Sequence, residues 1–182
     1  LAIFAIGISM QMNANLGAPP WDVFHQGVSN QTGITIGRVI VMTGFVLLFF
    51  WIPLKQKPGL GTILNALEIG LVADIALEII PEPNNLFVRI AMAGGGIVVV
   101  ALGTGLYIGS ALGPGPRDGL MTGLAKRGIP IRVGRTAIEV AVLVTGFLLG
   151  GQVGIATFAF ALGVGPLVQF FLPRMAVKKP TI

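Results

Sequence analysis

Gly113-Pro114-Gly115-Pro116-Arg117-Asp118 interrupts an otherwise apolar stretch with two prolines, two glycines and a charge pair. Because proline lacks a backbone N–H and clashes with the preceding turn, this segment cannot lie within a continuous helix. Proline is favoured at the first position of a helix, so Pro116-Arg117-Asp118 predicts the first turn of a new, short helix. A related stretch, Gly17-Ala18-Pro19-Pro20-Trp21-Asp22, lies upstream. We therefore expect a broken helix at the centre of each half of the chain.

The composition is typical of a membrane protein. Of the 182 residues, 54% are hydrophobic and 10% are charged, whereas soluble domains carry about 25% charged residues. The mean hydropathy of +0.88 also indicates lipid as the surrounding solvent. The net charge is +5, but the basic residues are too scattered for a nucleic-acid-binding surface. We expect the chain to contact a lipid bilayer and no nucleic acid.

Few side chains are suited to catalysis or metal binding. The chain has no cysteine, which excludes disulfides and thiolate metal sites, and its single histidine is His25. We therefore predict no enzyme activity, no cofactor and no metal site. The chain begins at Leu1 rather than at methionine, which is compatible with a trimmed N-terminus.

The same order of elements occurs twice along the chain. The first repeat, residues 1–83, is predicted to hold a spanning helix over 1–16, a break at 17–20, a short helix over 21–31 and spanning helices over 35–54 and 60–80. The second repeat, residues 84–175, is predicted to hold helices over 87–112, 117–124, 133–150 and 153–172, with a break at 113–116. A basic cytoplasmic tail is predicted over residues 176–182. About 20 residues are needed to span a bilayer, so the short helices do not cross it.

Matched residues support a duplication. Pro20 and Asp22 align with Pro116 and Asp118, and shared hydrophobicity does not explain matched prolines and aspartates. Each half holds three spanning helices, so the second half must enter the membrane from the opposite side. We predict an all-α membrane protein with six transmembrane helices in two inverted three-helix repeats, each with a broken segment and a short half-helix, within one membrane domain.

The basic residues support this topology. If the short helices do not cross, only Arg38 and Arg89 lie on one face of the membrane. The other face carries Lys55, Lys57, Arg117, Lys126, Arg127, Arg132, Arg135, Arg174, Lys178 and Lys179. Lysine and arginine are concentrated in cytoplasmic loops. We therefore predict a multi-pass protein with both termini in the cytoplasm.

The two aspartates in the first turns of the short helices are the first candidates for function. Asp22 and Asp118 can cap their helices, where a carboxylate is stabilised by free N–H groups and the helix dipole. Alternatively, both helix starts face a central cavity, bind an anion or polar solute and use the aspartates to tune charge or carry a proton. The candidate site residues from these first turns are Pro20, Trp21, Asp22, Pro116, Arg117 and Asp118. Trp21 and Trp51 also fit the pattern of interface anchors.

A second group of candidates lies in the spanning helices. Arg38 and Arg135 occupy matched positions and can pair with the aspartate of their own half, although Glu139 lies one turn after Arg135 and is an alternative partner. Glu68 lies about two turns into its helix and is our preferred proton or cation carrier, because acids at that depth are costly and are functional by default. The remaining candidates are the amides Asn13 and Asn65. Asp74 and Glu78 lie near the outer end of the same helix as Glu68, where we expect solvation at the interface.

These motifs resemble a known family. The stretch Gly103-Thr104-Gly105-Leu106-Tyr107-Ile108-Gly109, followed by Leu112-Gly113-Pro114-Gly115-Pro116-Arg117-Asp118-Gly119-Leu120-Met121, resembles the YczE/YitT family of bacterial integral membrane proteins. Gly59-Leu60-Gly61-Thr62 and the upstream stretch 17–22 fit the same pattern, so the resemblance covers nearly the whole chain. It implies a protein of the bacterial cytoplasmic (inner) membrane and favours transport, without a defined substrate.

The predicted function is transport. We expect a transporter or facilitator of a small polar or anionic solute, with a site near the membrane midplane between the two half-helices. Six helices are few for an alternating-access machine, so we expect a homodimer. Two alternatives remain open, namely an ion or solute channel and a non-transporting membrane assembly or regulatory subunit whose buried acids pair internally.

Overall fold

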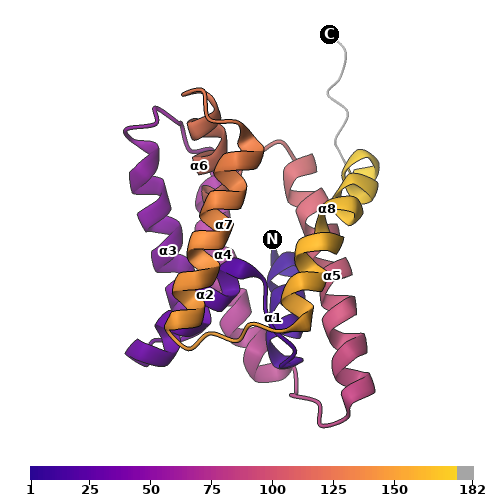
Figure 1. The fold of residues 1–182 in the computed structure, drawn as a ribbon. Helices are drawn as coiled ribbons and strands as arrows, with labels where there is room; N and C mark the ends of the chain where they lie inside the picture. Colours follow the sequence, from indigo (N-terminus) through magenta and orange to yellow (C-terminus); the bar gives the residue numbers. More distant parts are fainter. Residues whose placement is uncertain (176–182) are drawn as a thin grey trace.

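The computed structural model describes residues 1–175, which form eight α-helices and no β-strand (Figure 1). The helices are α1 (Ala2–Asn13), α2 (Pro20–Thr32), α3 (Ile36–Trp51), α4 (Leu60–Ile79), α5 (Leu86–Gly109), α6 (Pro116–Ala125), α7 (Ile131–Leu148) and α8 (Ile155–Met175). The prediction of an all-helical protein with two short helices after the Gly-Pro breaks is confirmed. The basic tail predicted over residues 176–182 lies outside the described residues.

Several helices are suited to a bilayer. Among residues 1–175, α4, α5 and α8 are each long and apolar enough to cross a membrane, and α2 and α3 together would make a fourth span bent by 114°. Large apolar side chains point away from the protein, as shown by Phe87 (83% exposed) and Leu162 (79% exposed). Water disfavours such an exposed apolar surface, whereas lipid tails accommodate it.

The two short helices lie toward opposite ends of the helix bundle (Figure 1). α5 packs against α1 and α8, and α4 packs against α1 and α3. α2 packs against α7, whereas α6 packs against α3 and α7. Each short helix therefore rests on a helix of the other half of the chain. The main hydrophobic core joins α1, α3, α4, α5 and α8 through Ala5, Ile8, Ile40, Ile69, Ala73, Val100, Ala101 and Val164.

The break before α6 is held by the first turn of α4. The carbonyl oxygen of Leu112 accepts a hydrogen bond of 2.9 Å from the backbone N–H of Gly61. The hydroxyl of Thr62 donates a bond of 2.7 Å to the carbonyl oxygen of Pro114 and accepts one of 3.1 Å from the N–H of Gly59. One buried hydroxyl therefore closes the start of α4 and anchors the break in the other half.

The break before α2 has a similar arrangement with the first turn of α8. The carbonyl oxygen of Leu16 accepts a hydrogen bond of 2.9 Å from the N–H of Ala156. Thr157 accepts a bond of 3.2 Å from the N–H of Gly154, and its hydroxyl lies beside Gly17. Each break is thus stabilised by the last helix of the opposite half.

Candidate functional site

A cavity of about 350 Å³ lies at the centre of the bundle, and all eight helices contribute to its lining. Its walls are mostly apolar, and its charged side chains are Asp22, Arg117, Asp118, Arg135 and Glu139. Binding sites for small molecules have this character, because apolar walls supply burial and a few polar groups fix the orientation of the ligand.

α2 and α6 both begin at this cavity. Pro20 and Pro116 occupy the first turns, as the sequence predicts, and the first N–H groups of a helix have no partner within it. The preceding residues, Pro19 and Gly115, have no side chain that can cap. Among residues 1–175, neither Asp22 nor Asp118 accepts a side-chain hydrogen bond from a backbone N–H. The carboxylates have other side-chain partners instead, and a direct capping hydrogen bond is not formed, although both aspartates lie in the first turn of their helix.

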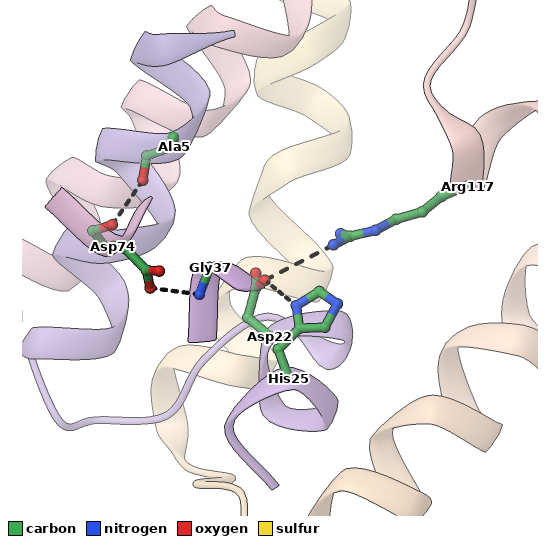
Figure 2. A network of polar contacts seen from close by, with 7 residues as sticks. Ala5, Asp22, His25, Gly37, Asp74 and Arg117 are labelled. Carbon is green, nitrogen blue, oxygen red and sulfur yellow. Dashed lines mark hydrogen bonds and ion pairs between the residues drawn. The ribbon is translucent and has the colours of Figure 1, made fainter. Parts of the chain in front are cut away.

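Asp22 joins the two short helices electrostatically (Figure 2). Its Oδ1 atom lies 3.1 Å from Nδ1 of His25 on the same helix and 4.0 Å from Nη2 of Arg117 on α6. Asp22 and His25 are buried, and the Arg117 side chain is 25% exposed. The guanidinium of Arg117 also lies 4.8 Å from the ring centroid of Trp21, within the range of a cation–π interaction. The first turns of two distant segments thus meet through a charge pair and an aromatic ring.

Asp118 has a different partner. The hydroxyl of Tyr107, in the last turns of α5, donates a hydrogen bond to Oδ2 of Asp118. Tyr107 lines the cavity but was not among the candidates from the sequence. The available signal was that it is the single tyrosine of the chain, placed in an apolar helix where its hydroxyl needs a polar partner.

The other cavity-lining candidates lie on α4 and α7. Asn65 borders the cavity and packs closely on Gly115. A Cβ added to Gly115 would lie only 3.1 Å from the amide nitrogen of Asn65. Nε of Arg135 donates a hydrogen bond of 2.8 Å to Oε1 of Glu139, one turn later on α7. The two alternatives left open for Arg135 are thus resolved in favour of Glu139. The expected pairing of each aspartate with an arginine of its own half is not observed, since Asp22 pairs with Arg117.

Four candidates lie outside the cavity lining. Arg38 is exposed and Glu68 is half-buried, and neither forms an ion pair within residues 1–175. Glu68 therefore lies apart from the charged side chains that line the cavity. Asn13 donates hydrogen bonds of 3.0 and 2.6 Å to the carbonyl oxygens of Leu77 and Ile80, and borders a second cavity of about 220 Å³. The carbonyl oxygen of Pro116 accepts a hydrogen bond of 2.9 Å from Nε1 of the buried Trp51.

Two further expectations are corrected by long-range contacts. Asp74 is not simply solvated at the interface, because its carboxylate accepts a hydrogen bond of 2.6 Å from the N–H of Gly37 (Figure 2). It also accepts one of 2.7 Å from the hydroxyl of Thr35. It therefore stabilises the start of α3 from α4. Trp51 is not an interface anchor, because its side chain is buried within the protein.

Comparison with known proteins places this fold in a family. DUF6198, described as a family of unknown function, matches residues 1–173. The chain belongs to the DUF6198 family. No solved structure matches this DUF6198 chain.

Three curated proteins are similar to this DUF6198 member over almost its full length. An uncharacterized protein of Haemophilus influenzae is 42% identical over 97% of this chain and 81% of its own. The uncharacterized membrane protein YczE of Bacillus subtilis is 30% identical over 96% of this chain and 82% of its own. The uncharacterized protein YyaS of the same species is 29% identical over 95% of this chain and 89% of its own. The resemblance to YczE is thereby confirmed, and together with the apolar helices it supports a membrane location.

Proposed function

We propose that the protein is a membrane transporter or facilitator for a small polar solute, which binds in the cavity between the starts of α2 and α6. The observation that carries this proposal is the contact of Asp22 with Arg117 across the two short helices, at the edge of a cavity of about 350 Å³. The first N–H groups of both helices and the positive ends of their dipoles are directed to that region. Transporters with broken helices use such helix starts to bind the polar groups of their substrates.

The proposal includes six membrane spans in two inverted repeats, namely α1, α3 and α4 in the first half and α5, α7 and α8 in the second. Three features support it. α2 and α6 lie toward opposite ends of the bundle (Figure 1), each short helix packs on the other half, and each break is bonded to the last helix of the opposite half. The end of the bundle with most of the basic residues is then cytoplasmic, in a bacterial inner membrane. A homodimer is part of the proposal because six spans are few for alternating access.

Uptake into proteoliposomes tests this function. The purified protein is reconstituted and given a panel of radiolabelled amino acids, organic acids, sugars, polyamines and inorganic phosphate. We expect saturable uptake of at least one compound, which Asp118→Asn abolishes. Glu68→Gln is the matched control, because Glu68 lies outside the cavity lining and its loss should leave uptake intact.

Three outcomes separate the alternatives. Uptake that does not saturate, together with single-channel currents, would indicate a channel instead. Folded protein that transports no member of the panel would favour a non-transporting membrane subunit. Normal transport by Asp118→Asn would show that uptake does not depend on the carboxylate of Asp118.

A further inference from the structure

Arg117 and Asp118 are adjacent, oppositely charged residues that both line the cavity and both have unused hydrogen-bonding capacity. Within residues 1–175 the guanidinium of Arg117 donates no hydrogen bond. The nearest carboxylate oxygen, Oδ1 of Asp22, lies 4.0 Å from Nη2, which is an ion-pair distance but too long for a hydrogen bond. The carboxylate of Asp118 has one hydrogen-bond partner in that range, the hydroxyl of Tyr107. A guanidinium offers five N–H donors, and a carboxylate accepts about four bonds. The cavity therefore presents free donors beside free acceptors.

The position of Arg117 is fixed without consuming its donors. The ring of Trp21 lies under the guanidinium, and Asp22 is itself held by His25 at 3.1 Å. A planar guanidinium held in this way is suited to bidentate binding of a carboxylate. Asp22 acts here as a positioning residue, because it is buried, is held by His25 and lies 4.0 Å from the guanidinium of Arg117.

The charges that face Arg117 distinguish among possible ligands. Asp22 comes from α2, Asp118 from α6, and the pair Arg135 and Glu139 from α7. Arg135 and Glu139 neutralise each other, so Arg117 faces two aspartates. A simple anion would add to this excess of negative charge, and a simple cation would leave the donors of Arg117 unused. Unpaired polar groups in a site of low dielectric are costly, so a ligand that carries both charges fits best.

We propose that the cavity binds a small zwitterion with an apolar body, such as an amino acid with an aliphatic side chain. Arg117 binds the carboxylate, and Asp118 accepts hydrogen bonds from the ammonium group. The aliphatic body lies against the apolar wall formed by Ile8, Ile40, Leu47, Ile69, Val100 and Val164. This assignment rests on the proposed function, since it names the class of solute for the same site.

Leucine and two analogues that each lack one charge provide the test. The full chain in lipid nanodiscs is titrated calorimetrically with leucine, with 4-methylpentanoate, which lacks the amine, and with 3-methylbutylamine, which lacks the carboxylate. We expect leucine to bind about tenfold more tightly than either analogue, or more, because each lost charge leaves a charged protein group unpaired. Equal binding of either analogue, or no binding of leucine to folded protein, would overturn the assignment.

Variants assign each charge to its residue. Arg117→Gln should remove the preference for leucine over the amine, and Asp118→Asn should remove the preference for leucine over the acid. Arg117→Lys keeps the charge and should retain the preference with weaker binding, which guards against a loss of folding in Arg117→Gln. Glu68→Gln should bind all three probes as the wild type does. Unchanged preferences in Arg117→Gln and Asp118→Asn would refute the assigned roles.

The binding measurement and the uptake measurement test the zwitterion assignment and the transport function separately. Leucine binding without uptake in proteoliposomes would support the zwitterion site and remove the transport function. Saturable uptake of another solute, without leucine binding, would support transport and remove the zwitterion assignment.

Discussion

Nε1 of Trp51, at the end of α3, donates a hydrogen bond of 2.9 Å to the carbonyl oxygen of Pro116, in the first turn of α6. The indole is 2% exposed, and it packs so closely on Gly119 that a Cβ there would overlap the ring. The start of α6 is therefore placed by a side chain from the other half. Arg117 and Asp118 depend on this contact for their position in the cavity.

Trp51→Phe should destabilise the protein by about 1–3 kcal/mol, because it removes the bond from the buried indole N–H to the carbonyl of Pro116 and leaves part of the space of the indole ring unfilled. The loss is measured as a lower midpoint of thermal unfolding in nanodiscs. Trp21→Phe is the matched control, since the Trp21 indole donates no hydrogen bond within residues 1–175, and it should change the midpoint less. An equal effect of the two substitutions would mean that the indole N–H of Trp51 contributes little.

Thr62→Val should destabilise the protein by about 1–3 kcal/mol. The substitution keeps the shape of the side chain but removes the bonds to Gly59 and Pro114, so a half-buried N–H and a carbonyl lose their partner. Thr145→Val removes only a bond to the carbonyl of Ala141 on an exposed helix face. Denaturant unfolding of both variants should show a clear loss for Thr62→Val alone. A similar loss in both would contradict the role of Thr62 as an anchor of the break.

Gly17→Ala should prevent normal folding. Gly17 has a φ of +105°, and an added Cβ would lie 2.6 Å from the hydroxyl oxygen of Thr157 and would overlap the backbone of Gly154. Gly33 also has a positive φ, +70°, but its Cβ would meet nothing within 4 Å. Gly33→Ala should therefore cost only the backbone strain of about 1–2 kcal/mol. The yield of folded protein on size-exclusion chromatography compares the two, and comparable yields would argue against the tight contact at the first break.

Single cysteines should report the inverted topology, because the chain has no cysteine of its own. Lys57 and Gln152 are exposed residues in equivalent turns of the two halves, the turns before α4 and α8. In intact cells a membrane-impermeant maleimide should label Gln152→Cys and should not label Lys57→Cys until the cells are opened. Asn84→Cys, in the linker between the halves, should behave like Gln152→Cys. Labelling of Lys57→Cys and Gln152→Cys from the same side would exclude inverted repeats.

Local features of the sequence predicted the helical class and the two breaks. The breaks at 17–20 and 113–116 follow from proline and glycine chemistry, which acts within one or two residues. The bond between Arg135 and Glu139 is also local, since residues four apart on a helix are neighbours. These features need no knowledge of how the helices pack.

Contacts between distant segments could not be predicted in this way. The partner of Asp22 is Arg117, and the partner of Asp118 is Tyr107. Glu68 was preferred for its depth in the helix, but depth does not specify which side of the helix faces the cavity. Trp51 was expected at the interface because tryptophan is common there, whereas its carbonyl partner lies in the other half. The site is built from tertiary contacts, and helical periodicity does not predict which distant residues are in contact.

The bonds between Leu16 and Ala156, and between Leu112 and Gly61, have a consequence for biosynthesis. The ribosome synthesises the start of α4 before the second break, so Gly61 is already present in the chain when Leu112 is added. The first break has no such advantage, because its partner on α8 is synthesised almost last. The first half must remain unfinished in the membrane during most of translation, and a chain that stops before α8 cannot complete it.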